Sequence, residues 1–443
     1  MIGIIMFIAA LMMLAVGYPV AFTFGSVSIF FGIFAAIIEL MPDISIVLIS
    51  EEFFQMFSMM PFRIYSIMNN TILMAIPLFI LMGIILQKSQ LAERLLEAMG
   101  ILFGKVRGGV AVSTVLVGAL LAASTGVVGA SVVAMGVISL PVMLKYGYSK
   151  KLATGTICAA GTLGQIIPPS IVLIILGDVF QQPVGDLFQA AVGPGLLLVV
   201  LYILYILVLA FFNKDVAPPL PVQTGSRAGN VKRAIIAIVP PLTLIVLVLG
   251  SIFAGIATPT ESASVGSVGA LVLAAMYRKL SWKIVEESAL ETVKITAMVF
   301  AILIGATAFS MVFVYSGADY IVEETLTNLP GQKWTFLLLS MLTIMLLGFF
   351  IDFIEISYIV VPILLPIADI IGLNPLWFAI LIAMNLQTSF LTPPFGFSLF
   401  YLKGVCPPEI RTVDLYRGVI PFIIIQMLVL ISIIIFPEFY GFN

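Results

Sequence analysis

Long apolar runs, separated by short segments that carry most of the charge, dominate this chain. A helix needs about 20 apolar residues to cross the hydrocarbon core of a bilayer, so each run of that length predicts one spanning helix. Apolar runs of 15 to 27 residues, each of which predicts a helix, occupy residues 2–16, 20–38, 71–87, 187–213, 235–254, 258–277, 297–315 and 419–436. Residues 39–70 mix apolar and charged positions, which predicts a segment lying along the membrane interface.

Two further runs are too long for one straight span. The first, Gly108–Leu144, holds no charged residue and has lysine or arginine on both flanks. Cytoplasmic loops carry an excess of positive charge, so both of its ends are predicted on the cytoplasmic side. The run therefore predicts a re-entrant helical hairpin with its tip at 124–131. The second run, Trp334–Ala368, predicts another hairpin, with its tip at 348–357 and both flanks outside.

Two more helices are predicted to break within the membrane, because each contains two consecutive prolines. The breaks lie in GTLGQIIPPS at 161–170 and in QTSFLTPPFG at 387–396. Proline cannot donate a backbone hydrogen bond and clashes with the preceding turn, so the first helix is predicted to end near 165–167. Backbone freed at this depth is tolerated where it is buried in protein or lines a cavity, so each break marks a candidate site. A simple proline kink is the alternative interpretation.

The two breaks belong to a longer internal repeat. Three features recur 225 positions later: Leu140-Pro141 as Leu365-Pro366, Gly147 as Gly372, and Pro168-Pro169 as Pro393-Pro394. This matched spacing predicts a duplication of nearly half the chain. Because one hairpin enters from the cytoplasm and the other from outside, the halves are predicted to have inverted topology. Inverted repeats with paired broken helices are an architecture of secondary transporters.

Composition and charge agree with a polytopic, all-α membrane protein. Hydrophobic residues make up 62% of the 443 positions and charged residues 9%, with a mean hydropathy of +1.23. Soluble domains carry about 25% charged residues, so a soluble globular domain is excluded. In the predicted topology every lysine and arginine except Arg63 and Lys333 faces the cytoplasm, as the positive-inside bias requires. The outer loops are acidic.

Several chemistries are not expected for this chain. The sequence has no histidine and only two cysteines, Cys158 and Cys406, which argues against histidine-based acid–base chemistry, a disulfide framework and a metal cluster. No Gly-x4-Gly-Lys-Ser/Thr pattern occurs, so ATP is not expected to drive the chain directly. We therefore expect no enzyme activity, no cofactor beyond coupling ions and no nucleic-acid partner.

The predicted elements group into five segments. Residues 90–103 and 281–294 place apolar side chains on one helical face, which predicts two amphipathic arms, and 217–221 predicts the linker between the halves. The segments are 1–107, scaffold helices with the first arm; 108–180, hairpin 1 with the first broken helix; 181–333, scaffold helices, linker and second arm; 334–404, hairpin 2 with the second broken helix; and 405–443, a C-terminal helix.

Several short motifs, together with the hairpin tip around Ser124 and both double-proline stretches, are typical of one transporter family. They are Gly17-Tyr-Pro-Val-Ala21, Ala75-Ile-Pro-Leu-Phe79 and Gly255-Ile-Ala-Thr-Pro-Thr-Glu261. With them, nearly the whole chain closely resembles the large membrane subunit of tripartite ATP-independent periplasmic (TRAP) transporters. The resemblance implies an elevator-type fold of the ion transporter superfamily in the bacterial inner membrane. It also implies sodium-coupled import of an organic acid, such as a C4-dicarboxylate or sialic acid.

The resemblance further implies two protein partners. One is a small four-helix membrane subunit, which we expect here as a separate chain. The other is a soluble periplasmic protein that binds the substrate and delivers it. The acidic outer loops would give this binding protein a docking surface, which salt would weaken because exposed charges are screened.

Sodium and substrate are expected at the breaks and the hairpin tips. A broken helix turns the partially negative carbonyl end of one half toward a cation and the partially positive amide end of the other toward an anion. The repeat and the resemblance place the first sodium site at Ser124, Thr125, Gly126, Gly164, Ile167 and Pro169, and the second at Gly348, Asp352, Ser389, Thr392 and Phe395. The carboxylate substrate is expected at Thr162, Ser170, Gln387 and Gly396.

Several of these residues, and a few others, can also be explained by a purely structural role. Small residues at the tips also suit close helix packing. Asp352 and Glu355 are acids at membrane depth, which suggests function, but both would be hydrated at the mouth of the hairpin. The order Thr258-Pro-Thr-Glu261 predicts a capping box for its glutamate. Arg63 fits an interfacial anchor better than a ligand for a carboxylate.

Three functions are compatible with these residues. The first is the membrane subunit of a sodium symporter that depends on a binding protein. The second is a self-sufficient sodium/carboxylate symporter of related fold, which differs from the first in needing no partner. The third is an ion channel, but a channel requires a continuous polar pore lining, whereas the polar groups here gather at two midplane sites.

Overall fold

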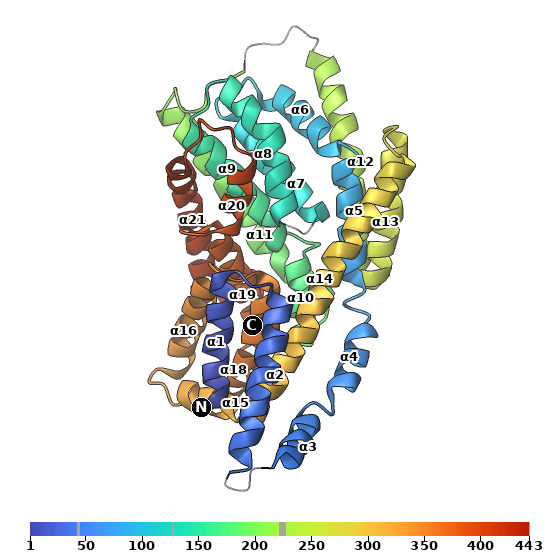
Figure 1. The fold of residues 1–443 in the computed structure, drawn as a ribbon. Helices are drawn as coiled ribbons and strands as arrows, with labels where there is room; N and C mark the ends of the chain where they lie inside the picture. The colour runs from blue at the N-terminus through green and yellow to red at the C-terminus, as the bar shows by residue number, and fades with distance from the viewer. Residues whose placement is uncertain (42–44, 126–127, 221–226, 443) are drawn as a thin grey trace. The chain divides into compact units, whose positions relative to one another are not determined.

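The computed structural model describes residues 1–41, 45–125, 128–220 and 227–442 (Figure 1). All regular structure in these ranges is helical, which confirms an all-α protein. Seven of the described helices are long and apolar enough to cross a membrane, or eight if the bent pair 75–88 and 93–100 forms one span. The contacts divide the chain into unit 1, residues 1–73 with 294–375, and unit 2, residues 74–293 with 376–443.

Unit 1 holds the N-terminal helices and hairpin 2. Its elements are α1 (Ile2–Val16), α2 (Val20–Glu39), α3 (Ile46–Met56), α4 (Met60–Met68), most of α14 (Trp282–Tyr315), α15 (Ala318–Thr327), α16 (Gln332–Leu347), α17 (Phe353–Glu355), the π-helical segment η2 (Ile356–Val360) and α18 (Val361–Ile370). A left-handed Gly17 ends α1 and Pro19 precedes α2, which confirms the predicted joint between these helices. Helices α3 and α4 expose large apolar side chains, including Phe54 and Phe62.

Unit 2 holds hairpin 1 and both broken helices. Its elements are α5 (Ala75–Lys88), α6 (Leu91–Phe103), α7 (Gly109–Thr125), α8 (Val128–Lys145), α9 (Lys150–Thr162), the 3-10 turn η1 (Leu163–Gln165), α10 (Ile171–Val179), α11 (Val184–Phe212), α12 (Arg227–Phe253), α13 (Pro259–Met276), α19 (Pro375–Leu391), α20 (Phe397–Val405), α21 (Thr412–Ile435) and η3 (Pro437–Tyr440).

Helix α9 lies at the centre of unit 2. Every residue from Leu152 to Thr162 is buried, and α7, α8 and α21 pack around the helix. Glycines permit this close approach. A Cβ atom at Gly155 would lie 2.1 Å from the carbonyl oxygen of Gly418 on α21, and one at Gly161 would lie 2.3 Å from a methyl carbon of Val132 on α8. The small residues of α9 therefore set the spacing of its neighbours.

Hairpin 1, formed by α7 and α8, has both of its ends on one short strap, Val216–Leu220. The Gly108 N–H donates to the Ala217 carbonyl at 3.0 Å, and the Ser149 N–H donates to the Val216 carbonyl at 2.9 Å. The chain therefore enters and leaves the hairpin at the same end, which agrees with the prediction from its flanking charges. Most of the predicted linker is part of this strap and is held by backbone hydrogen bonds.

The helix boundaries repeat with the same spacing as the motifs. Three pairs of helix ends lie 225 positions apart: Val128 of α8 and Phe353 of α17, Lys145 of α8 and Ile370 of α18, and Lys150 of α9 and Pro375 of α19. Gly147 and Gly372, just after two of these ends, adopt left-handed φ angles of 80° and 73°, a conformation that ends helices and favours glycine. The local structure thus supports the duplication, whereas the opposite orientation of the halves stays a prediction.

The first predicted arm is helix α6. Its inner face carries the buried side chains of Leu91, Leu95 and Leu96, and helices α7 and α12 pack against it. The arm is therefore covered by protein on much of its apolar face. Its exposed face carries Glu93 and Glu97.

The second predicted arm, 281–294, is wrong as a separate element. Helix α14 runs without a break from Trp282 to Tyr315 and so includes both the arm and the span predicted after it. No glycine or proline lies between 281 and 304, so nothing in the sequence stops the helix where its pattern changes from amphipathic to apolar.

The joint between α5 and α6 is tied to the joint between α13 and α14. The Lys88 ammonium lies 3.2 Å from a carboxylate oxygen of Glu287 and 3.3 Å from one of Glu291. Lys279, just after α13, donates a hydrogen bond to the side chain of Gln90, just before α6. These contacts hold the residues just before α6 against the end of α13 and the first turns of α14.

Candidate functional site

The first broken helix ends as its prolines require. Helix α9 stops at Thr162, the turn η1 follows, and α10 begins at Ile171. In a continuous helix the N–H groups at positions 168 and 169 would bind the carbonyls of Gly164 and Gln165, but proline has no N–H. The Gly164 carbonyl is thereby released for other ligands, whereas the Gln165 carbonyl accepts the Ser170 hydroxyl at 2.7 Å.

The second broken helix is constructed in the same way. Helix α19 ends at Leu391 and α20 begins at Phe397. Its prolines lack the N–H groups that would bind the carbonyls of Ser389 and Phe390, and the Phe390 carbonyl instead accepts the Ser398 hydroxyl at 2.9 Å. Phe390 is the repeat equivalent of Gln165, so each break satisfies the same carbonyl with a serine hydroxyl. The Pro–Pro bond is cis in both breaks.

The structure places the break residues of the first predicted sodium site. Gly164 and Pro169 are buried and Ile167 is half-buried. Of the tip residues, Ser124 and Thr125 end helix α7, and Gly126 lies outside the described residues. The turn η1 packs against α7 and α8, so hairpin 1 does cover the break. The ligands from the tip stay a prediction.

The residues of the second predicted sodium site are divided between the two units. In unit 1, Gly348 is buried after α16, and Asp352 caps α17 by accepting the next N–H at 2.7 Å. In unit 2, the hydroxyls of Ser389 and Thr392 donate to carbonyls one turn earlier, at 2.8 and 2.7 Å. Their oxygen lone pairs stay available to a cation. Phe395 is 57% exposed.

The structure distinguishes between the functional and structural interpretations of Glu355 and Glu261. Glu355 is 2% exposed and its Oε2 has no hydrogen-bond partner, so it does not lie in water at the mouth of the hairpin. Asp352 is half-buried. Glu261 forms the predicted capping box, because its carboxylate accepts the Thr258 N–H at 2.8 Å and its own N–H donates to Thr258 Oγ1 at 3.3 Å. The capping prediction is confirmed.

The predicted substrate residues are all buried. Thr162, Ser170 and Gln387 have no exposed surface. The Ser170 hydroxyl caps α10 by accepting the Leu173 N–H at 3.5 Å, in addition to its bond to the Gln165 carbonyl. Gly396 caps α20 with a φ of 38°. Binding of substrate at these positions stays a prediction.

A polar cluster around the first break was missed in the sequence analysis. Gln426 of α21 donates through Nε2 to the Tyr202 hydroxyl of α11 at 2.7 Å, and the same nitrogen lies 3.4 Å from the Thr162 hydroxyl of α9. Gln165 of η1 and Gln426 are both fully buried. A signal was present in the sequence, because a lone amide inside an apolar run at membrane depth is unusual.

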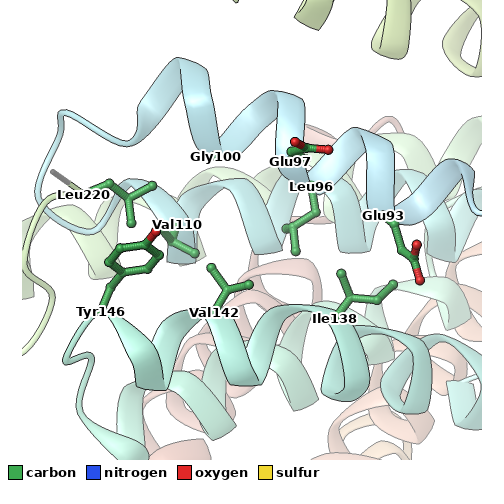
Figure 2. A pocket seen from close by; sticks show the side chains of 9 residues that line it. All are labelled: Glu93, Leu96, Glu97, Gly100, Val110, Ile138, Val142, Tyr146 and Leu220. Carbon is green, nitrogen blue, oxygen red and sulfur yellow. The ribbon is translucent and has the colours of Figure 1, made fainter. Parts of the chain in front are cut away.

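A separate cavity of about 170 Å³ lies between the arm α6 and helix α8. Figure 2 shows the apolar side chains of Leu96, Val142 and Ile138 pointing into it, with Glu93 and Glu97 at its edge. Val110, Tyr146, Gly100 and Leu220 complete the wall. No lining residue comes from a broken helix, so this cavity is distinct from the candidate site.

The breaks offer neutral oxygen ligands from carbonyls, hydroxyls and side-chain amides, together with the N-termini of α10 and α20. Neutral oxygens suit a cation, and helix N-termini suit an anion. Among the described residues, no group of three or more His, Cys, Asp or Glu side chains gathers that could hold a metal ion. The arrangement thus fits the reversible binding of small ions.

The comparisons with a family model and with individual proteins agree on one family. Residues 7–439 match the family model described as "Tripartite ATP-independent periplasmic transporter, DctM component". The C4-dicarboxylate TRAP transporter large permease protein DctM of Pseudomonas aeruginosa is 32% identical over 85% of this chain and 86% of its own length. The ectoine/5-hydroxyectoine large permease UehC of Ruegeria pomeroyi is 31% identical over 83% and 84%. The sialic acid large permease SiaM of Vibrio cholerae is 28% identical over 84% and 86%.

Two solved structures share the fold at low sequence identity. The YdaH transporter of Alcanivorax borkumensis superposes with a TM-score of 0.62 at 15% identity, covering 88% of this chain and 90% of its own. MtrF of Neisseria gonorrhoeae superposes with a TM-score of 0.61 at 11% identity, covering 94% of both chains. At these identities the likeness concerns the fold alone.

Proposed function

Because the chain belongs to the DctM-component family of tripartite ATP-independent periplasmic transporters, we propose that it is the permease subunit of a sodium symporter that imports a carboxylate across the bacterial inner membrane. The observation that carries the coupling proposal is the pair of matched helix breaks. In each break the prolines remove two backbone donors, and a serine hydroxyl satisfies the carbonyl of the equivalent residue, Gln165 or Phe390. Two equivalent breaks give two places for a dehydrated cation.

The substrate class follows from the relatives. Their names give C4-dicarboxylates, sialic acid and ectoine, which all carry a carboxylate. Residues 152–213 and 376–402, which include both breaks, contain no lysine or arginine. The carboxylate is therefore held by helix N-termini and neutral side chains, with sodium supplying the positive charge.

The movement we propose is an elevator in which hairpins and broken helices shift against an anchored remainder. Residues 108–180 and 334–404 form the moving element. Helices α11 and α21 join it, because both are linked to α9 through Gln426. The arm α6 anchors the remainder, since Lys88 and Gln90, just before it, bind Glu287 and Glu291 of α14 and Lys279 after α13.

Two partners complete the proposed system. A small four-helix membrane subunit, as a separate chain, widens the anchored part, and a periplasmic binding protein delivers the substrate. The alternative is a self-sufficient sodium/carboxylate symporter. The experiment that separates them is uptake of radiolabelled succinate, sialic acid and ectoine into liposomes under a sodium gradient, with this chain alone or with both partners.

We expect little uptake by the chain alone and sodium-dependent uptake of one acid when both partners are present. Robust sodium-driven uptake by the chain alone would favour the self-sufficient symporter. Uptake that persists when choline replaces sodium would refute sodium coupling.

A further inference from the structure

Two glutamine side chains in unit 2 are fully buried with neither amide atom hydrogen-bonded. They are Gln165, in the 3-10 turn of the first break, and Gln387, in the last turn of α19 before the second break. The carbonyl Oε1 of a third buried glutamine, Gln426, is also unpaired. An unpaired amide inside a membrane protein is strongly unfavourable, so these atoms require a hydrogen-bond or ion partner.

Two of the amides, Gln387 and Gln426, lie at the Tyr202 hydroxyl, and the third, Gln165, lies one turn after Thr162, which Gln426 also approaches. Gln426 donates to the Tyr202 hydroxyl at 2.7 Å, and Gln387 approaches the same hydroxyl without making a hydrogen bond of good geometry. The nitrogen of Gln426 also lies 3.4 Å from the Thr162 hydroxyl. Gln165 follows Thr162 by three positions across the junction of α9 and η1, a spacing that places two side chains on one helical face. The cluster thus joins both broken helices with α11 and α21.

We propose that this amide cluster, Gln165, Gln387 and Gln426, binds the carboxylate of the substrate together with one sodium ion. The unpaired Nε2 atoms of Gln165 and Gln387 donate to the carboxylate, and the unpaired Oε1 atoms ligate the sodium. Neither ion alone satisfies both kinds of atom, whereas the pair does. A carboxylate and a sodium ion also cancel each other's charge, which reduces the cost of taking either out of water.

The inference rests on the proposed function and specifies its substrate site. It assigns Gln165, Gln426 and the positioning hydroxyl of Tyr202, and it keeps Gln387 and Thr162 from the sequence prediction. Ser170 is left with a structural role, because its hydroxyl already bonds the Gln165 carbonyl and the Leu173 N–H. The chemistry is recognition by neutral amides, so the site takes a carboxylate without a basic side chain.

The cluster is closed in the described structure, because all three glutamines have no exposed surface. The turn η1, which carries Gln165, packs against α7 and α8. Hairpin 1 therefore covers the site on that side. Movement of hairpin 1 away from η1 would open the site on that side.

The test uses thermal stability of the purified full chain in detergent. Sodium succinate, sialic acid and ectoine are titrated separately, in sodium chloride and in choline chloride, to obtain an apparent Kd for each. We expect at least one to stabilise the wild-type chain in sodium and not in choline. Q165M and Q387M, which keep the side-chain volume, should each weaken that apparent Kd by about tenfold or more, as expected for losing a hydrogen bond to a charged group. Q387E should abolish binding by repulsion.

The melting temperature of each variant without ligand provides a second readout. Here the substitutions are expected to have no harmful effect, although they weaken binding. Replacing an unpaired buried amide with an apolar group of similar volume should leave the melting temperature unchanged or raise it. The matched control is T156V, which also removes a fully buried, unpaired polar atom but lies six positions before Thr162, about 9 Å along α9. It should leave the apparent Kd unchanged.

Two results would overturn the inference. One is an apparent Kd within about twofold of wild type in both Q165M and Q387M, which means that water alone fills the cluster. The other is a wild-type chain that none of the three acids stabilises in sodium. Normal partner-dependent uptake with an unchanged Kd removes this site and leaves the proposed function standing. Binding that depends on the glutamines but is accompanied by no uptake would support this site and refute the proposed function.

Discussion

Helices α9 and α19 begin at equivalent positions of the repeat, yet their buried surfaces are built from different side chains. Helix α9 is rich in alanine, glycine and threonine, and α21 and α8 approach its backbone at Gly155 and Gly161. Helix α19 is also buried, but with large side chains such as Trp377 and Phe378. The paired prolines therefore end a helix in both settings, whether small or large side chains surround it.

The hairpins differ in a similar way. Helix α8 is continuous and carries no acid, whereas its counterpart begins with Asp352 and Glu355 and passes through the π-helical segment η2 before α18. π-Helical segments occur often at functional sites. Hairpin 2 thus adds ionisable groups at the positions where hairpin 1 offers only small and apolar residues.

The largest expected difference between the halves is the side of the membrane that they face. On a background lacking Cys158 and Cys406, S149C and N374C occupy equivalent positions of the repeat, after α8 and α18. In intact cells, a membrane-impermeant maleimide should label N374C, whereas S149C should react only after the membrane is opened. Labelling of both variants from the same side would exclude the inverted repeat.

The difference in packing between α9 and α19 predicts that a substitution at equivalent positions prevents folding only in α9. Gly155→Leu places a side chain where even a Cβ atom would meet the backbone of Gly418, so we expect no monodisperse protein by size-exclusion chromatography in detergent. Ile380 is the equivalent residue of α19 and is fully buried. Ile380→Ala should leave a folded chain that is about 2–5 kcal/mol less stable, because it creates a cavity. Folded Gly155→Leu protein would contradict the close approach of α9 and α21.

The sodium sites are expected to differ in their use of side chains. Thr392→Val removes a hydroxyl ligand from the second site. Because one oxygen ligand is lost, the half-saturating sodium concentration for uptake should rise by roughly several-fold. Ile167 is its repeat equivalent and would act only through its backbone. Ile167→Val should therefore leave the sodium dependence unchanged. S124A at the first tip should also raise the sodium requirement, and unchanged values for both hydroxyl variants would remove these side chains from the sites.

The smallest expected effect concerns the feature that the breaks share. Ser170→Ala and Ser398→Ala each remove a hydroxyl that satisfies the carbonyl at the equivalent repeat position. Each should lower the free energy of unfolding by about 1–3 kcal/mol, because a buried carbonyl is left unpaired. Unfolding in denaturant, followed by tryptophan fluorescence, measures the two losses. A loss in one variant only would show that the serines are not equivalent.

Local signals explain which parts could be predicted from the sequence. Prolines and glycines act on their own turn of backbone, so the breaks at 168–169 and 393–394 and the turns at Gly147 and Gly372 could be predicted. Charge asymmetry predicted the shared base of hairpin 1. The arm at 281–294 was misjudged because a change from amphipathic to apolar pattern does not require a helix to end.

The amide cluster could not be assembled from the sequence. Gln426 and Thr162 are 264 positions apart, and their contact depends on how α21 packs against the glycines of α9. No periodicity or motif connects them. Gln165 stood inside the predicted break, but its role becomes apparent only when the partners of its neighbours are known.

The strap Val216–Leu220 has a consequence for the origin of the molecule. A cut between positions 220 and 227 would separate two fragments, each with its own hairpin and broken helix. The strap would remain in the first fragment, still bonded to Gly108 and Ser149 at the base of hairpin 1. The first fragment therefore keeps the strap that binds both ends of hairpin 1, shortly after its last helix, α11. This is the place at which the fusion of two gene copies could occur without disturbing the hairpin of the first.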